Sequence, residues 1–331
     1  MKKAYLKIVV VIICITIIAA PNKAKAQDPV YAQYFTSPLS LNPALAGSKS
    51  NLNNRFSLTY RNLLSNGGAS LFKTTSLSYE RKITKRDSSN RDYFAIGGMF
   101  YSEKMGNGLL TQSFGNFTTS YFNALNDDGT TGVSAGISVS YGNRMLDIEK
   151  ARTQDMFSSF GFSNPGTTID PSLSNINVSY IYANAGVGYD AKLSEQAQWH
   201  FGAAMFRVSK PNETKSGNTK LDPRYVLESN LTQQLSSTES LEFLGTSQWM
   251  SAKNFTTVGL KYGKSLDIQH LIEIGVLNRI RDAVIPYVGL GFNNGTNNLK
   301  FGLSYEIVTS KVRTIYNAQS TAELSFIWTL K

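Results

Sequence analysis

Cysteine and histidine are both scarce in this 331-residue chain. The single cysteine, Cys14, lies in an apolar run near the start of the chain, and the two histidines, His200 and His270, lie far apart. No His-Glu-x-x-His pair and no Gly-x-Ser-x-Gly motif is present, so the usual signatures of a zinc site and of a nucleophile elbow are missing. We therefore expect no catalytic residues, no metal and no cofactor, and we interpret both histidines as structural.

Long hydrophobic runs are also lacking, with one exception at the N-terminus. Residues Ile8 to Ala20 form an apolar run of 13 residues that follows three lysines and precedes the small-residue sequence Ala24-Lys25-Ala26. The run is too short to span a bilayer as a helix. The pattern predicts a secretory signal peptide over residues 1–26, with a retained membrane anchor as the alternative.

An excess of positive charge is lacking once that signal is removed. The full chain has 33 basic and 23 acidic residues, and five of the lysines belong to the signal, which leaves 33 − 5 = 28 against 23. No Lys/Arg run is long enough to suggest a nucleic-acid partner. No change in composition or linker divides the remaining residues, so we expect one domain.

The chain does contain a recurring alternation of apolar and small polar residues. From Val133 to Gly142 every second residue is apolar and the others are serine or glycine, which is the period of a β-strand with two unlike faces. The same pattern returns at 299–307 and 322–330. Fourteen strands are predicted in this way, at 53–61, 70–82, 91–102, 109–125, 132–142, 176–190, 199–208, 222–235, 241–250, 255–264, 270–278, 283–292, 299–308 and 320–330.

These strands favour an outer-membrane barrel over a soluble all-β protein, which is the alternative. Most are nine residues or longer, as a tilted membrane strand requires, and longer than the average soluble strand. Aromatic residues near strand ends suit the interfacial girdles of such a barrel, and the small polar face suits a wet lumen. The tyrosines assigned to the girdles are Tyr60, Tyr101, Tyr121, Tyr141 and Tyr305. We predict an all-β transmembrane outer-membrane barrel of about 14 antiparallel strands over residues 53–331, in contact with outer-membrane lipid.

The lengths of the connections support this topology. The three longest, 143–175, 209–221 and 309–319, follow the fifth, seventh and thirteenth strands. In a barrel with both termini in the periplasm, odd-numbered connections are extracellular and are the ones that grow long. The first of them has a charged piece followed by Phe157, Phe160 and Phe162, and we leave open a docking surface, a lid over the mouth or an ordinary loop.

Residues 27–52 do not alternate and need a separate explanation. Asn42 is a favoured N-cap, Pro43 suits the first helical position and Gly47 suits a left-handed stop, which predicts one short helical turn. Asp28-Pro29 is a second start signal, with Tyr31, Tyr34 and Phe35 on one side of a short helix. A capped, aromatic-faced segment needs a surface, and we expect it in the pore or at the periplasmic rim of the barrel.

The residues of this segment resemble the N-terminal signature of the PorP/SprF family of the Bacteroidota type IX secretion system. The matching residues are Asp28, Pro29, Gln33, Tyr34, Pro38, Asn42, Pro43, Ala44 and Gly47. Further matches along the barrel are Tyr60, Arg61, Arg279, Asp282, Ser304, Tyr305 and Glu323. The chain departs from the family pattern at Leu63-Leu64, at Glu306, where the family often has Asp, and at its C-terminal end.

The resemblance implies a non-enzymatic outer-membrane barrel that works with type IX components. Its role would be to help secrete or anchor a large cell-surface protein, often an adhesin linked to gliding motility, and some members are linked to a periplasmic peptidoglycan-binding protein. The N-terminal motif would then plug the pore or dock in the periplasm. The wet lumen face equally allows a passive channel or a hydrophobic-solute transporter, which is our alternative.

Overall fold

The computed structural model describes residues 30–48, 53–65, 70–84, 91–147, 150, 157–158, 161–162, 177–212, 220–251, 253–310 and 318–330. The expected signal peptide over residues 1–26 lies outside this part of the chain. The long strands are β1 (Asn54–Ser65), β2 (Ser70–Thr84), β3 (Tyr93–Met105), β4 (Leu110–Ala124), β5 (Gly132–Leu146), β8 (Val178–Ser194), β9 (Ala197–Phe206), β10 (Arg224–Gln234), β11 (Glu239–Met250), β12 (Lys253–Ser265), β13 (His270–Arg279), β14 (Ala283–Asn293), β15 (Asn297–Val308) and β16 (Ala318–Leu330).

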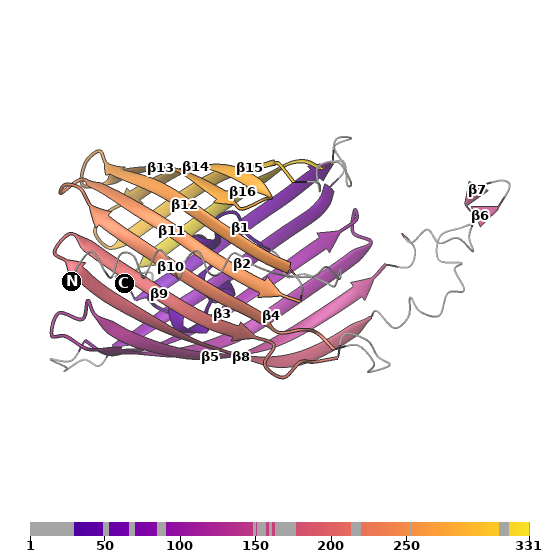
Figure 1. Cartoon of the computed structure of the whole chain (residues 1–331), viewed down its shortest axis with the longest axis horizontal. Coiled ribbons are helices and arrows are strands. Elements are labelled where there is room, and N and C mark those ends of the chain that lie inside the picture. Colours follow the sequence, from indigo (N-terminus) through magenta and orange to yellow (C-terminus); the bar gives the residue numbers. More distant parts are fainter. Residues whose placement is uncertain are drawn as a thin grey trace.

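These fourteen strands form one closed antiparallel barrel, as the sequence predicts (Figure 1). Each strand pairs with its neighbours in the chain, and β1 pairs with β16 to close the sheet. Closure leaves no unpaired strand edge, which is the condition for a sheet to cross a bilayer. No helix in the described ranges is long and apolar enough to span a membrane.

The two faces of the barrel wall follow the alternation in the sequence. In β5, Ile137 is 62% exposed on the outer face, whereas its neighbour Ser138 is 4% exposed and faces the lumen. The same reversal holds along β15, where Leu303 and Tyr305 face outward and Ser304 faces inward. An apolar exterior with a polar interior is the arrangement that lipid requires of a membrane barrel.

The assignment of Tyr101 to the aromatic girdles is wrong. Tyr121, Tyr141 and Tyr305 are exposed on the outer face, but Tyr101 points into the lumen, where its ring stacks on Phe114 at 4.7 Å between centroids. The neighbouring Phe100 occupies the outer face instead. Because residues 99–101 are all apolar, the alternation there does not reveal which face is which.

The connections are distributed as expected. The longest ones join β5 to β8, β9 to β10 and β15 to β16, and all three leave the end of the barrel opposite to the β1 start, where Asn54 pairs with Leu330. The β5–β8 connection also contains a two-stranded hairpin, β6 (Phe157–Ser158) and β7 (Gly161–Phe162), outside the barrel sheet (Figure 1). Phe160 lies outside the described residues. The end with Asn54 and Leu330 is therefore the periplasmic end.

Candidate functional site

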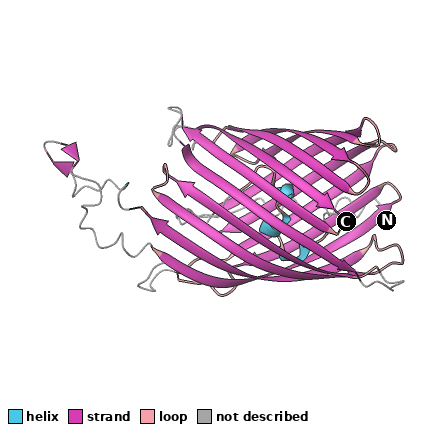
Figure 2. Cartoon of the chain, turned by 180° about the vertical axis from the view of Figure 1, so that it is seen from behind, coloured by secondary structure: helices cyan, strands magenta, loops and turns pink. Residues whose placement is uncertain are grey.

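The N-terminal segment lies inside the barrel. Residues 30–48 form three 3-10 turns, η1 (Tyr34–Thr36), η2 (Pro38–Ser40) and η3 (Pro43–Leu45), and Figure 2 shows them within the lumen. Most of their side chains are buried, and Tyr34, Leu39 and Leu45 are among the most deeply buried in the molecule. The turns form one core cluster with lumen-facing residues of several strands. We call residues 30–48 the lumen segment.

The predicted capped turn is confirmed in atomic detail. The Asn42 side-chain oxygen accepts a hydrogen bond from the Ala44 backbone N–H at 2.9 Å, and Pro43 is the first residue of η3. Gly47 has φ +74°, the left-handed conformation expected of a stop. The other expectation, a helix begun at Asp28-Pro29, falls partly outside the described residues, and the part that is described shows η1 beginning at Tyr34.

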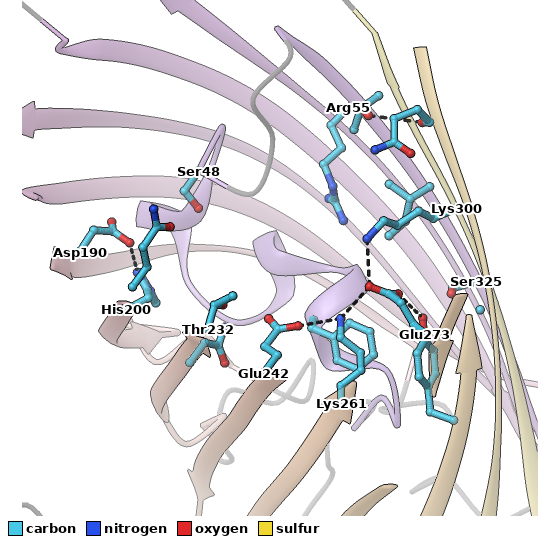
Figure 3. Close-up of a pocket in the computed structure, with 18 of the residues that line it drawn as sticks. Ser48, Arg55, Asp190, His200, Thr232, Glu242, Lys261, Glu273, Lys300 and Ser325 are labelled. Carbon is cyan, nitrogen blue, oxygen red and sulfur yellow. Dashed lines mark hydrogen bonds and ion pairs between the residues drawn. The ribbon is translucent and has the colours of Figure 1, made fainter. Parts of the chain in front are cut away.

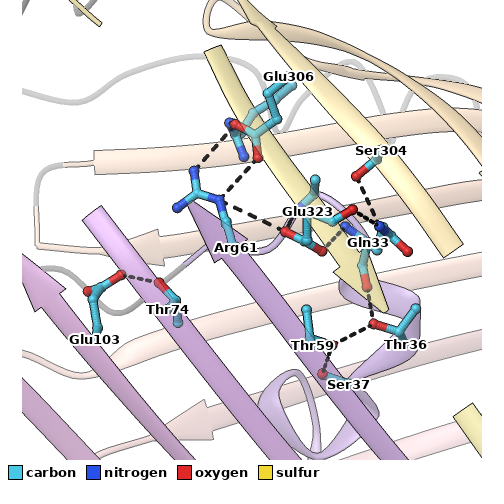
Figure 4. A network of polar contacts seen from close by, with 12 residues as sticks. Gln33, Thr36, Ser37, Thr59, Arg61, Thr74, Glu103, Ser304, Glu306 and Glu323 are labelled. Carbon is cyan, nitrogen blue, oxygen red and sulfur yellow. Dashed lines mark hydrogen bonds and ion pairs between the residues drawn. The ribbon is translucent and has the colours of Figure 1, made fainter. Parts of the chain in front are cut away.

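The first contact of the lumen segment with the wall is made by Glu323 of β16. Its two carboxylate oxygens accept hydrogen bonds from the backbone N–H groups of Ala32 and Gln33, both at 2.8 Å (Figure 4). The Gln33 side chain donates to the Glu323 carbonyl at 2.8 Å and to Ser304 at 3.1 Å, and it accepts from Ser325 at 2.6 Å. Every hydrogen-bonding atom of the Gln33 side chain is thereby engaged with β15 and β16.

A second contact is an ion pair that binds the lumen segment at two points. Arg55 of β1 pairs with Glu80 of β2 at 2.7 Å and donates to the Thr36 carbonyl at 2.7 Å. The other Glu80 oxygen accepts from the Gly47 backbone N–H at 3.0 Å. One buried pair thus fixes both the first turn and the end of the third.

A third contact lies on the opposite wall. The Asn42 amide donates to the Val187 carbonyl of β8 at 2.9 Å and to Glu228 of β10 at 3.0 Å. Arg224 of β10 donates to the Ser40 carbonyl at 2.8 Å. The lumen segment is therefore hydrogen-bonded to strands on opposite sides of the barrel, and it crosses the lumen between them.

Two glycines in the wall make room for the third turn. A Cβ at Gly136 of β5 would lie 2.5 Å from the Pro43 carbonyl carbon, and one at Gly186 of β8 would lie 1.9 Å from the Asn42 side-chain oxygen. Both distances are far below van der Waals contact. Gly186 is thus a position where the wall must be thin, and its cause is the close approach of Asn42.

A cluster of buried charges surrounds the contact at Glu323. Arg61 of β1 lies 3.3 Å from Glu306 and 3.9 Å from Glu323, and Arg279 of β13 pairs with Glu306 and, at 2.6 Å, with Asp282. Buried charges of this kind need partners on several sides, because desolvation is costly. The cluster contains two arginines and three carboxylates, so most of its charges are balanced internally.

The structure brings together most of the residues that the sequence singled out. Arg61, Arg279, Asp282, Ser304 and Glu323 meet on one wall of the lumen, whereas Tyr60 and Tyr305 lie on the outer face. In the lumen segment the buried members are Gln33, Tyr34, Pro38, Asn42, Pro43, Ala44 and Gly47. Asp28 and Pro29 lie outside the described residues.

Sequence reasoning missed several residues of this site. Glu306, treated as a departure from a family pattern, lies at the centre of the charge cluster. Arg55, Glu80 and Glu228, which hold the lumen segment, were not identified. The available signal was a charged residue in the inward phase of a strand, since such residues are rare and need a partner.

A polar cavity of about 500 Å³ lies on the periplasmic side of the lumen segment (Figure 3). Its lining includes a chain of alternating charges, in which Glu242 lies 2.7 Å from Lys261, Lys261 lies 3.4 Å from Glu273 and Glu273 lies 3.1 Å from Lys300. The Lys261 ammonium also stands 4.8 Å from the centre of the Phe35 ring in the lumen segment. We call this space the periplasmic vestibule.

A group of aromatic rings lies on the extracellular side of the lumen segment. Tyr101, Phe114, Tyr180 and Tyr182 pack together, and the hollow between this group and Leu39 has a volume of about 30 Å³. That is the space of about one water molecule. Beside the lumen segment, the larger described cavity therefore lies on the periplasmic side.

The histidines occupy different settings. His200 faces the lumen, with Nδ1 2.8 Å from Asp190 and Nε2 3.6 Å from Glu228. His270 begins β13 at the periplasmic end and contacts Asp267 of the preceding turn at 2.7 Å. Within the described ranges no three histidine, cysteine or acidic side chains gather as a metal site would require.

A closed, lipid-facing barrel whose interior holds its own N-terminal segment defines an outer-membrane β-barrel protein, and the outer membrane is its location. The sequence matches the family model described as type IX secretion system membrane protein PorP/SprF over residues 23–328. The chain belongs to this family, which associates it with type IX secretion.

Comparison with solved structures shows the same fold in outer-membrane channels. A Pseudomonas aeruginosa FadL homologue superposes with TM-score 0.54 at 11% identity, covering 87% of this chain and 92% of that one. The Pseudomonas putida toluene transporter TodX gives 0.53 at 10% identity (88% and 92%), and the Ralstonia pickettii toluene transporter TbuX gives 0.52 at 11% (89% and 94%). Identities this low establish the fold alone. A comparison with curated protein sequences gives no match.

Proposed function

We propose that this protein is a non-enzymatic accessory of the type IX secretion system that helps to secrete or anchor a large cell-surface protein of the adhesin or gliding-motility type. Membership of the PorP/SprF family supports the link to secretion. The observation that carries the proposal further is the filled lumen. A barrel whose interior is occupied by its own segment is suited to act as a platform for partners, because a segment bonded to opposite walls obstructs the path of a solute.

The proposal divides the chain into three parts. Residues 1–26 are a secretory signal peptide, residues 27–52 are the plug and residues 53–331 are the barrel. Two alternatives for the N-terminal motif, closing the pore and docking in the periplasm, are no longer equivalent. Burial of Gln33, Asn42 and Pro43 between opposite walls supports pore closure by the lumen segment.

The partners follow from the two ends of the barrel. Type IX components and the secreted protein would engage the extracellular connections, of which the β5–β8 connection is the longest. On the periplasmic side, the vestibule would remain accessible to a periplasmic protein, including a peptidoglycan-binding one. Its lining carries both signs of charge, which suits a polar protein surface better than an apolar solute.

A hydrophobic-solute transporter is the second candidate. Two observations favour it: the same fold occurs in two toluene transporters, and an aromatic group faces the extracellular half of the lumen. Transport would require the plug to leave, since it crosses the lumen between opposite walls and the hollow beside it measures only about 30 Å³.

Deletion of the gene separates the two candidates. The host is assayed in parallel for display of its large surface proteins and for uptake of monoaromatic hydrocarbons. Loss of one surface protein with unchanged uptake is expected for the secretion accessory. Normal display with reduced uptake would replace it by the transporter.

A further inference from the structure

The barrel closes at a seam between its first and last strands. There β1 and β16 pair from Asn54↔Leu330 to Ser65↔Ala318, and Arg61 faces Glu323 directly across the pair. In a barrel made of consecutive hairpins, this is the one pairing between strands that are far apart in the chain, so it carries the largest loop-closure cost. We call the β1–β16 pair the closing seam.

The lumen segment binds both strands of the closing seam within five residues. On β16, the Glu323 carboxylate accepts hydrogen bonds from the backbone N–H groups of Ala32 and Gln33. On β1, Ser57 and Arg55 each donate to the Thr36 carbonyl at 2.7 Å, and the Thr36 and Thr59 hydroxyls lie 3.3 Å apart. Residues 32–36 therefore form a bridge across the seam.

Glu323 is the centre of that bridge. Its side chain is fully buried, and a buried carboxylate is tolerated when charge-assisted hydrogen bonds compensate for its lost hydration. The nearest cation is Arg61 at 3.9 Å, and Arg61 makes its closer contacts with Glu306. The two short bonds from the lumen segment therefore provide much of the compensation.

We infer that Glu323 positions the plug, and that residues 32–36, once docked on the wall, staple β1 to β16. The barrel then closes with the plug already in place, and not before the plug has docked. An empty lumen would leave Glu323 without its two backbone donors at the strand that must pair last. This inference rests on the proposed role of residues 30–48 as a plug. It adds a role in assembly that pore closure alone does not require.

The test compares two buried glutamates that both hold the lumen segment. Glu323→Gln weakens its contact at the closing seam, and Glu228→Gln is the matched control, because Glu228 binds Asn42 on the opposite wall. Each purified full-length barrel in lipid vesicles is examined by amide hydrogen exchange, which reports local opening of individual strands. The measured quantity is the exchange rate in β1 and β16 relative to that in β8 and β9.

We expect exchange in β1 and β16 to accelerate at least tenfold in Glu323→Gln, with little change in β8 and β9. The control should leave the closing seam protected. Equal loss of seam protection in both variants, or none in either, would overturn the inference. If Glu323→Gln does not fold, Gln33→Ala removes the side-chain bonds to Glu323 and Ser304 without altering the wall, and the same pattern is expected from it.

Refolding of a barrel that lacks residues 28–47 separates the staple from the plug. We expect the closed, detergent-resistant form to appear at least tenfold more slowly than with the full chain, and a synthetic peptide of residues 27–48 to restore the rate. Closure at the normal rate would contradict the staple. Ion conductance of the same deleted barrel tests the plug separately. A conductance equal to that of the full-length barrel would refute pore closure by the plug, whatever the rate at which the barrel itself closes.

Discussion

Substitution of Gly136 by alanine is the most local perturbation of the plug that the barrel wall allows. The new Cβ would lie 2.5 Å from the Pro43 carbonyl, whereas ordinary contact begins near 3.4 Å, so the third turn must move by 3.4 − 2.5 = 0.9 Å. The obstacle is backbone and cannot rotate away. Overpacking of this kind costs about 1–3 kcal/mol, and loss of the Asn42 cap adds about 1 kcal/mol. The free energy of plug docking should therefore become less favourable by about 2–4 kcal/mol. This lowers the ratio of docked to undocked molecules by roughly 30- to 700-fold.

The assay is single-channel conductance in planar bilayers, with the open fraction as the measured quantity. The matched control is Gly115→Ala in β4, where the added Cβ meets no atom within 4 Å. Both changes replace a strand glycine by alanine, so their backbone effects are alike. An increased open fraction in Gly136→Ala with a normal control is expected. Equal behaviour of the two variants would show that the third turn does not hold the pore closed.

Three further predictions concern the plug and the outer face of the barrel. Asn42→Ala removes a cap and a donor to the wall, so plug docking should weaken by about 1–3 kcal/mol, measured as a higher open fraction. Ile137→Arg should destabilise the barrel in lipid by about 2–4 kcal/mol if that face meets the bilayer core, as measured by urea unfolding in vesicles, whereas Ser134→Ala on the lumen face of the same strand should have little effect. Burial raises the pKa of both Tyr31 and Tyr34 above the ordinary value of 10.0, so the undocked segment ionises first and docking should weaken as the pH rises above 10. Conductance that is independent of pH between 9 and 12, or equally dependent in a Tyr31→Phe/Tyr34→Phe variant, would contradict the last prediction.

Much of the barrel could be predicted from the sequence because a membrane strand must satisfy two different solvents at once. Lipid outside and water inside impose an alternation of apolar and polar residues along each strand. This alternation was enough to predict the number of barrel strands and the outward face of residues such as Leu303 and Tyr305. The prediction failed at Tyr101, where the lumen wall is itself aromatic and both faces are apolar. The strand ends were also imprecise: β5 continues to Leu146, beyond the predicted end at 142.

The local structure of the lumen segment could be predicted from the sequence, but its contacts with the barrel wall could not. Asn42, Pro43 and Gly47 act on residues within the same turn, so their sequence order reveals the capped turn. The partners of Gln33 and Asn42 are Glu323 and Glu228, which are 290 and 186 residues away in the chain. No local pattern encodes such a distance. An inward-phase charge on a strand is the feature that marks these partners.

The central claim is that residues 30–48 close the pore, and deletion of Asp28 to Gly47 tests it most directly. The deleted and full-length barrels are reconstituted side by side in planar bilayers. The contacts to Glu323, Glu80 and Glu228 predict a low conductance for the full chain and a large, stable increase on deletion. A deleted barrel that folds and conducts no better than the full chain would contradict it.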